Sequence, residues 1–340
     1  MSAGTPGTLH RRTFLALAAS AVVAGCNDTT QPDAAPVVAK DHGPVPSAPA
    51  PKAPAPTTQA KPLTSRPPAP SELGVIPVLM HHRLAANVNG EYDMTPAFFR
   101  AELERLYREG YHPIRTIDLV RRDLSAVPEG KTPVVLTFDD STPGQFALDK
   151  SGRVVPDTAL GIMLAFQTRY PDFPAVGSFY LNRSPFGLSG AEVPRALRYL
   201  NDAGCELGNH TWDHPNLRHL ETAEAESEIG RLAAMITAAV PAAPARTIAL
   251  PLGVHPRDHR VLAAGGRGGT AYKNEGVLLV GAGPCPSPYG KSFDPMAIPR
   301  IRCSSYQGGQ GNLLMDYWLD RLPRQKFVAG SNNSKVVAQG

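Results

Sequence analysis

Most of this 340-residue chain predicts an α/β fold whose strands form a parallel sheet or barrel. Short apolar runs, which are typical of buried strands, alternate with longer amphipathic stretches, which are typical of helices. Their spacing leaves room for a helix after most strands, as parallel strands require. Two groups of polar residues follow predicted strands, and such folds place their catalytic groups at the carboxyl ends of strands.

The first predicted helix has clear signals at both ends. The hydroxyl of Thr95 suits a helix cap, and Pro96 suits the first turn. Phe99 and Leu103 share one apolar face, and Gly110 is a suitable end. The same reasoning predicts strands near 75–80, 133–138, 175–181, 205–208, 247–250, 276–281 and 298–302, and helices near 158–169, 191–203, 221–239, 256–264 and 311–321.

The N-terminus resembles an export signal. Two arginines, Arg11 and Arg12, precede an apolar core at 14–24, which is too short to span a bilayer. The core ends in Val-Ala-Gly-Cys26, which is similar to a bacterial lipobox, so we expect residues 1–26 to be a signal peptide and Cys26 to carry lipid. Several acyl chains on one cysteine would hold the protein at the outer face of a bacterial membrane. A plain secretory signal with a chance cysteine is the alternative, and twin-arginine or general export stays open.

The composition separates a linker from the globular part. Of the 35 prolines, 12 lie between residues 31 and 70 together with Ala, Thr and Lys, so this composition predicts a disordered linker over residues 27–72. The 34 Lys and Arg nearly balance the 30 Asp and Glu, which argues against a nucleic-acid binder. We therefore expect a globular domain at 73–322, a C-terminal tail at 323–340 and a monomer.

Three cysteines remain besides Cys26, and none has the spacing of a metal site. An exported protein can form disulfides, so a bond between Cys285 and Cys303 is possible. Cys205 lies in an apolar run and is expected to be a buried thiol.

Asp139 and Asp140 directly follow the mostly apolar run Val-Val-Leu-Thr-Phe. Adjacent carboxylates after a strand point in different directions, so one could bind a metal while the other handles a proton. The alternative is a turn with two solvated aspartates.

His210 and His214 form a second group in the segment Gly-Asn-His-Thr-Trp-Asp-His. Two histidines at this spacing can share one face of a turn and bind one metal. Together with an aspartate they would leave positions open for water and substrate.

These segments together resemble the NodB-homology family of polysaccharide deacetylases. The similarity rests on Thr-Phe-Asp-Asp at 137–140, Gly-Ser-Phe-Tyr at 177–180, His-Thr-x-x-His at 210–214 and Ala-Leu-Pro-Leu-Gly at 249–253, and it covers about residues 73–302. It implies a distorted (β/α) barrel of about seven strands.

Residues before the aspartate pair resemble a subgroup with a circularly permuted chain, which includes poly-N-acetylglucosamine deacetylases. This second resemblance rests on the segments 75–83, 92–96 and 110–113. In that subgroup a Tyr-His-Arg segment supplies the catalytic acid. His82 matches its histidine, and His81 takes the tyrosine position, either as a polar wall residue or with a surface role. No histidine follows His259, where other members place this acid.

The resemblance implies a role for each site residue. Asp140, His210 and His214 would bind a divalent metal, expected to be zinc, with cobalt or nickel as alternatives. Asp139 would be the general base and His82 the acid. The backbone N–H of Leu252 would hold the oxyanion, with Pro251 beside it in the substrate site, and Trp212 would stack on a sugar ring or simply pack.

Two positions depart from the family pattern. Ser141 follows the aspartate pair where glycine is usual. The arginine that contacts the catalytic aspartate in many members falls at Ala249, so Arg300 is the candidate replacement.

Three functions follow from this sequence. The first is a metal-dependent N-deacetylase of a cell-surface polysaccharide such as poly-N-acetylglucosamine, peptidoglycan or a chitin-like glycan. The second is an esterase that removes O-acetyl groups with the same site. The third is a non-catalytic glycan-binding lipoprotein on a decayed barrel.

Overall fold

The computed structural model describes residues 66–281, 283–308, 311, 314–331 and 336. The predicted signal peptide, Cys26 and most of the predicted linker lie outside the described residues. All elements below belong to the described part of the chain.

The main sheet contains eight strands, and every pairing between them is parallel. Seven strands follow one path, in the order β11-β8-β7-β6-β5-β1-β12, and β4 pairs with β5 beside that path. The strands are β1 (Val78–His81), β4 (Tyr111–Ile114), β5 (Thr132–Phe138), β6 (Ser178–Leu181), β7 (Glu206–Asn209), β8 (Thr247–Ala249), β11 (Gly276–Leu278) and β12 (Ile301–Arg302).

The path of strands curls until its two ends meet. Leu278 in β11 forms a parallel bridge with Ile298, shortly before β12. One edge of β5 pairs with β1, while the other pairs first with β4 and then with β6. The predicted distorted (β/α) barrel is therefore confirmed.

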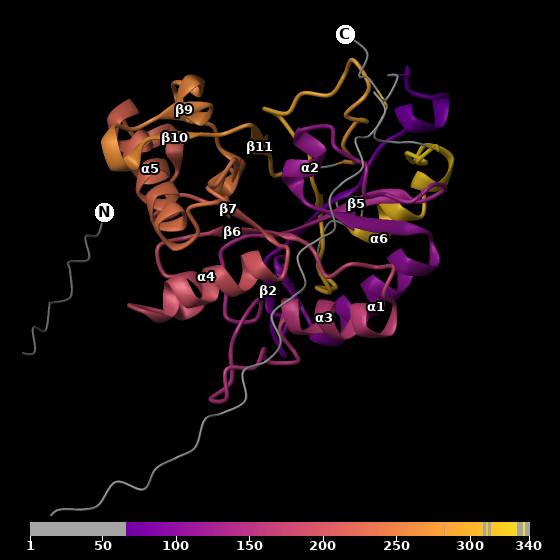
Figure 1. The fold of residues 1–340 in the computed structure, drawn as a ribbon, viewed down its shortest axis with the longest axis horizontal. Helices are drawn as coiled ribbons and strands as arrows, with labels where there is room; N and C mark the ends of the chain where they lie inside the picture. Colours follow the sequence, from indigo (N-terminus) through magenta and orange to yellow (C-terminus); the bar gives the residue numbers. More distant parts are fainter. Residues whose placement is uncertain (1–65, 282, 309–310, 312–313, 332–335, 337–340) are drawn as a thin grey trace, which may run out of the picture. The chain divides into compact units, whose positions relative to one another are not determined.

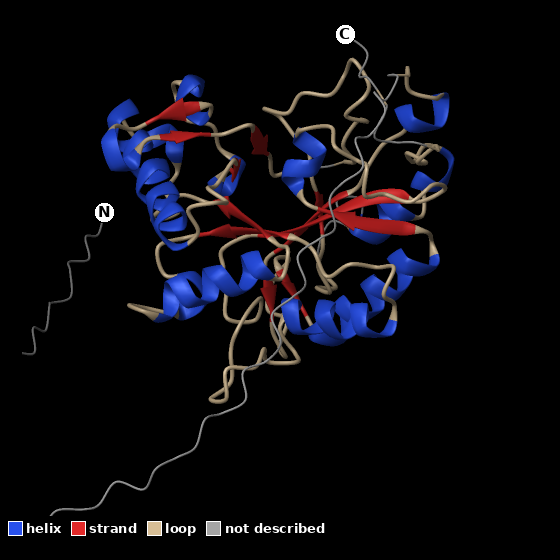
Figure 2. Cartoon of the chain, in the orientation of Figure 1, coloured by secondary structure: helices blue, strands red, loops and turns tan. Residues whose placement is uncertain are grey.

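Helices cover the outside of the strands (Figures 1 and 2). The helix α1 begins as predicted, because Thr95 Oγ1 accepts a hydrogen bond of 3.1 Å from Phe98 N, and Gly110 follows it with φ +80°. Its apolar face, which includes Phe99 and Leu103, is fully buried. In Figure 1, α1 lies beside α3 and α4 beside α5. The helices are α1 (Pro96–Arg108), α2 (Thr116–Val120), α3 (Ala159–Arg169), α4 (Glu192–Asp202), α5 (Thr222–Ala239) and α6 (Met315–Leu319).

Several predicted elements differ from the structure. The helix expected at 256–264 is only a 3-10 turn, His259–Leu262, because the chain turns there into the pair β9 (Ala264–Gly265) and β10 (Tyr272–Lys273). A second small pair, β2 (Arg83–Leu84) and β3 (Asp93–Met94), and the strand β4 were not predicted.

The N-terminal end of the barrel is closed by both ends of the described chain. Glu72 is fully buried and accepts hydrogen bonds of 2.7 and 2.5 Å from Arg66 and of 3.1 Å from Gly330 N. Phe327 is also fully buried, and its N–H donates to Val75 O. The fold therefore starts before residue 73, and much of the expected tail after 322 packs on the barrel.

The three cysteines in the described residues are free and buried. Cys285 bridges to Ile76 near the start of β1, whereas the N–H of Cys303 donates to Met80 O near the end of that strand. The suggested Cys285–Cys303 disulfide is therefore wrong for this structure. Burial raises the pKa of the Cys205 thiol to about 12, which agrees with the expected buried thiol.

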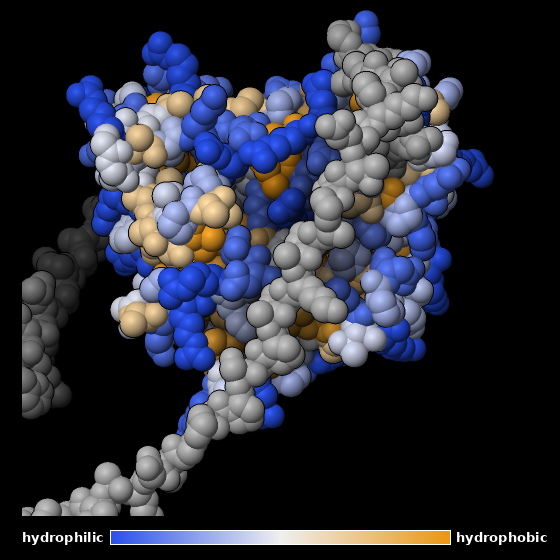
Figure 3. Space-filling model, in the orientation of Figure 1, coloured by the Kyte–Doolittle hydropathy of each residue, from blue (hydrophilic) through white to orange (hydrophobic). Residues whose placement is uncertain are grey.

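The surface drawn in Figure 3 is mostly hydrophilic, and apolar residues show on it only in patches. Among the described residues, no helix combines the length and the apolar character needed to cross a membrane.

Candidate active site

Most of the residues singled out in the sequence meet at the carboxyl ends of β1, β5 and β7. They surround a cavity of about 220 Å³. A cavity of about 290 Å³ opens at the start of β7, but none of its lining residues belongs to a metal-ligand cluster. The smaller cavity is lined by His82, Tyr92, Asp139, Asp140, His210, His214, Leu250, Leu252 and Val280.

Asp140, His210 and His214 form one cluster of possible metal ligands, as predicted. Asp140 Oδ1 lies 3.4 Å from His210 Nε2 and 3.6 Å from His214 Nε2. His210 Nδ1 lies 2.8 Å from the carbonyl of Ala249, so it carries the proton and leaves Nε2 free for a metal. Two imidazoles and a carboxylate are ligands that zinc accepts, so these residues fit a divalent ion.

The backbone around this cluster is strained. Asp140 has φ +70°, Thr211 φ +66° and His214 φ +53°, all in the left-handed region that non-glycine residues rarely adopt. Ser141, in the position where the family usually has glycine, also has a positive φ of 44°. Such strain concentrates at functional sites, where the surrounding structure holds it in place.

Negative charge dominates around His210. Burial alone would lower the pKa of this histidine, but the carboxylates of Asp139 and Asp140 outweigh that effect and raise it. A site that favours the charged imidazolium attracts positive charge in general. The electrostatics therefore agree with a cation site.

Asp139 is fully buried and pairs with Arg300. The guanidinium donates two hydrogen bonds to the carboxylate, 2.8 Å to Oδ1 and 2.7 Å to Oδ2. Burial alone would raise the pKa of Asp139, but the charges of Arg300 and His210 hold it well below its usual value. Asp139 is thus ionised at neutral pH, and Arg300 occupies the role suggested for it.

His82 also lies close to the carboxylate of Asp139. Its Nε2 is 3.9 Å from Asp139 Oδ2, and His210 Nε2 is 3.9 Å from the same oxygen. The ring of Tyr92 packs edge-on against His82 at 4.6 Å between centroids. Burial lowers the pKa of His82 to about 4, although the two aspartates oppose the shift. His82 Nδ1 is buried and has no hydrogen-bond partner among the described residues.

The remaining predicted residues divide into two groups. Leu252 lines the cavity, is 60% exposed and has φ +56°, so its backbone turns at the site. Pro251 is buried and does not line the cavity. Trp212 does not line it either, because the ring packs on the core and Arg231 lies 4.4 Å over its face. This arrangement agrees with the packing alternative for Trp212, and the stacking role stays a prediction.

His81 is not a wall residue of the cavity. It is fully buried and points away from His82 toward α1, where its Nε2 contacts Glu102. Successive residues of a strand face opposite sides, so His81 and His82 cannot both face the cavity. The sequence analysis also missed Tyr92, Leu250 and Val280 as lining residues. Tyr92 was visible as an aromatic residue near the histidines, but Leu250 and Val280 carry no chemical signal.

The sequence is similar to a known family and to a known protein. Residues 126–266 match the polysaccharide deacetylase family. A chitooligosaccharide deacetylase from a Bradyrhizobium strain is 31% identical over 153 residues, which cover 45% of this chain and 59% of that protein. The matched family region contains Asp139, Asp140, His210 and His214 but neither His82 nor Arg300.

The fold resembles solved deacetylase structures. A Streptococcus pyogenes deacetylase in complex with acetate has a TM-score of 0.52 at 18% identity, covering 68% of this chain and 92% of that one. A polysaccharide deacetylase from Bacillus cereus has a TM-score of 0.50 at 18% identity, covering 67% and 64%. The chain therefore contains a segment, residues 126–266, that matches the polysaccharide deacetylase family within a barrel of the same kind.

Proposed function

We propose that this chain is a metal-dependent hydrolase that removes acetyl groups from N-acetylated sugars of a cell-surface polysaccharide. The observation that carries the proposal is one cavity that holds an ionised, buried Asp139 beside the Asp140–His210–His214 cluster. Hydrolysis of an amide requires a base for water, a group that stabilises the oxyanion and an acid for the amine, and this cavity offers all three.

Asp140, His210 and His214 would hold the ion, expected to be zinc, with cobalt or nickel as alternatives. When bound there, a divalent ion supplies Lewis acidity at the acetyl carbonyl and lowers the pKa of water. Asp139 accepts the proton from the attacking water, and Arg300 keeps its carboxylate ionised and fixes its orientation. The N–H of Leu252 donates to the oxygen on which negative charge develops.

His82 delivers a proton to the leaving nitrogen. Its lowered pKa makes its protonated form a strong acid, so the proton passes readily to an amine. Its Nε2 lies 3.9 Å from Asp139 Oδ2, so a bridging water can pass the proton from the base to the acid. Acetate and a free amino sugar leave. Because His82 directly follows β1 and lies ahead of Asp139 in the chain, we also propose that the barrel is circularly permuted relative to other family members.

We further propose that the protein is exported and anchored by lipid on Cys26, with an acetylated polysaccharide as its partner and a monomeric barrel. Cys26 in its Val-Ala-Gly-Cys context supports this proposal. Replacing Cys26 with Ala should release the protein from membranes while acetate release by the barrel persists. Lipid-free wild-type protein in the cytoplasm would contradict it.

One assay tests the catalytic proposal. Purified protein is incubated with N-acetylated and O-acetylated polymers, with and without a chelator, and acetate is measured. We expect release from the N-acetylated polymer that stops with chelator and returns with zinc. Release from the O-acetylated polymer alone would assign an esterase, and no release from either would assign a glycan-binding protein.

A further inference from the structure

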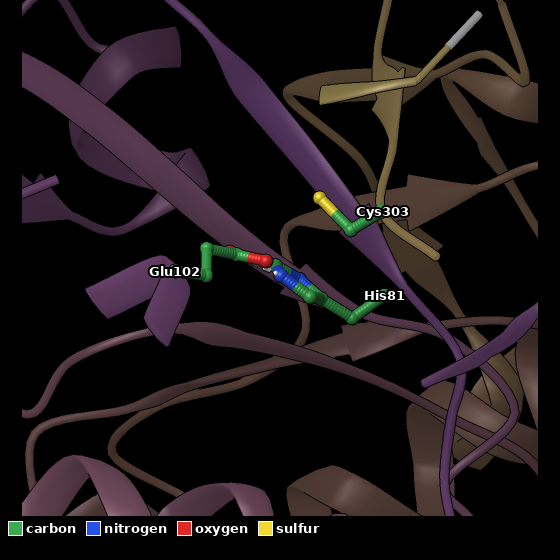
Figure 4. Close-up of side chains that lie close together, drawn as sticks. All are labelled: His81, Glu102 and Cys303. Atoms are coloured by element: carbon green, nitrogen blue, oxygen red, sulfur yellow. Dashed lines mark hydrogen bonds and ion pairs between the residues drawn. The ribbon is translucent and has the colours of Figure 1, made fainter. Parts of the chain in front are cut away.

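Three buried polar side chains lie beside the active site and have no role in the reaction above. They are His81 at the end of β1, Glu102 in α1 and Cys303 just after β12, and each is at most 2% exposed. Figure 4 shows that His81 and Glu102 point toward each other from a strand and a helix. Burying such groups in a core that includes Phe99 and Phe138 costs free energy, so their presence requires an explanation.

The hydrogen bonds fix the state of the His81 ring. Nδ1 lies 3.0 Å from the carbonyl oxygen of Thr137, which can only accept, so Nδ1 carries a proton. Nε2 lies 2.7 Å from Glu102 Oε1. Two atoms this close need a proton between them, because both would otherwise be acceptors. His81 is therefore held by a strand on one side and a helix on the other.

His81 contacts three consecutive residues that lead into the active site. Its ring nitrogen binds the carbonyl of Thr137, its ring stacks on Phe138 at 4.9 Å between centroids, and its own carbonyl accepts a 2.9 Å hydrogen bond from Asp139 N. The next residue in the chain is His82. Residue His81, through its ring and its backbone carbonyl together, thus joins the segments that carry the proposed base and the proposed acid.

A metal ion is the competing explanation, because the ligand atoms of His81, Glu102 and Cys303 lie within 4.8 Å of one another. Zinc bound to nitrogen and oxygen at 2.0–2.2 Å in a tetrahedral site would separate these atoms by about 3.3 Å. The observed 2.7 Å is the length of a hydrogen bond. Burial also raises the pKa of the Cys303 thiol, which favours the protonated form that does not bind metal.

We propose that His81 and Glu102 are positioning residues that set the place of Asp139 and His82 relative to each other. The pair touches neither the cavity nor the substrate. This inference rests on the proposed function, since it concerns the base and the acid of that reaction. A displacement of about 1 Å in such groups can lower the rate about 10²-fold.

Three variants test the pair by kinetics. Glu102→Leu removes the partner of His81 and should lower kcat about 10²-fold with little change in KM. Glu102→Gln can still donate an amide N–H to Nε2 and should keep most of the activity. Glu104→Gln is the matched control on the same helix, because Glu104 pairs with Arg169 outside the site, and it should leave kcat unchanged.

Loss of stability must be separated from loss of positioning. The double variant His81→Phe with Glu102→Leu replaces both partners by apolar groups, which can be nearly neutral for stability. It should fold, keep the ring stacked on Phe138 and still show the reduced kcat. A folded double variant with wild-type kcat would overturn the proposal, as would a Glu102→Leu variant whose folded fraction has wild-type kcat.

Crystal structures and metal analysis give readouts that do not need activity. The separation of His82 Nε2 from Asp139 Oδ2, 3.9 Å here, should change in the double variant and stay in Glu102→Gln. If the wild type releases no acetate, the proposed reaction fails, and this distance still decides the positioning claim. An unchanged distance in the double variant overturns it. Two zinc ions per wild-type chain, falling to one in Cys303→Ala, would instead assign a second metal site.

Discussion

The two ends of the barrel each contain a buried carboxylate held by an arginine, and the two pairs differ in use. At the carboxyl end of β5, Asp139 and Arg300 are both fully buried and the carboxylate lines a cavity. At the other end, Glu72 is buried, but the Arg66 side chain is 29% exposed. The same kind of interaction therefore holds the proposed general base at one end and helps to close the fold at the other.

The backbone shows the same contrast. The left-handed residues near the cavity include Asp140, Thr211, His214 and Leu252, whereas the segment 66–75 contains none. Strain is tolerated where side chains must converge, and the closing segment has no such demand.

The largest effect is expected at the metal cluster. Replacing His214 with Ala should abolish both zinc binding and acetate release, because two ligands do not hold the ion. The free energy of unfolding of the metal-free protein should change little, since this side chain is 33% exposed. Metal analysis and an acetate assay measure the result. His259→Ala, on an exposed turn outside the cavity, is the control and should retain both. Full turnover by a metal-free His214→Ala protein would refute the metal role.

The next effect concerns the base and the acid. Asp139→Asn and His82→Asn should each lower kcat by about 10² to 10⁴, the usual contribution of one acid–base group. Zinc content should stay at the wild-type value, because neither residue is in the ligand set. The measurement is kcat of each variant and of the wild type at equal zinc content per chain. A His82→Asn variant with wild-type kcat would mean that another residue supplies the acid, and it would remove the main support for the permuted arrangement.

The two arginine pairs should differ in stability. Arg300→Gln leaves Asp139 charged and buried without its partner, so we expect a loss of about 3–5 kcal/mol in the free energy of unfolding, together with lower kcat. Arg66→Gln should cost about 1 kcal/mol or less and leave kcat unchanged, since Arg66 is partly solvated and Glu72 keeps backbone donors. Urea unfolding of both variants measures the difference. Equal losses would contradict the contrast between the two ends.

The smallest effect is a pH dependence at the closing end. Burial alone would raise the pKa of Glu72, but hydrogen bonds from Arg66 and from backbone N–H groups lower it below its usual value. The unfolded pKa is about 4.3, so this stabilisation is complete above that pH and is lost as the pH falls through the lower folded value.

Glu72→Gln removes this titration. Its stability deficit relative to wild type should therefore shrink between about pH 5 and pH 3, as measured by urea unfolding at several pH values. A deficit that stays constant or grows over this range would show that Glu72 is not stabilised in its ionised form.

The sequence predicted the barrel well because its strands and helices carry local signals. Thr95, Pro96 and Gly110 mark the first helix at both ends, and the run ending at Phe138 is an unmistakable buried strand. The short strand β4 was missed because Pro113 lies within it, and proline normally argues against a strand. It is tolerated because β4 pairs with β5 alone and is an edge strand, where a residue without an N–H donor can be accommodated.

The site could be predicted where its residues lie close together in the sequence. Asp139 with Asp140, and His210 with His214, were noticed from their spacing, and the family resemblance of the combined segments then suggested their roles. Arg300 lies 161 positions from Asp139, so only the resemblance to a family that uses an arginine could suggest it. His81 was placed wrongly because neighbouring histidines look equivalent in a sequence, whereas the alternation of a strand sends one to the cavity and the other to the core.

The closed end of the barrel has a consequence for how the protein can be handled. Arg66 bridges to Val336 beside the buried Glu72, so the described chain begins and ends close together and away from the catalytic mouth. A barrel attached to a bead or fused to a carrier through either of these points would keep that mouth accessible to a long polymer. If the proposed function holds, such attachment would suit solid-phase treatment of insoluble glycans, and an expression boundary drawn at residue 73 would remove the arginine that secures this arrangement.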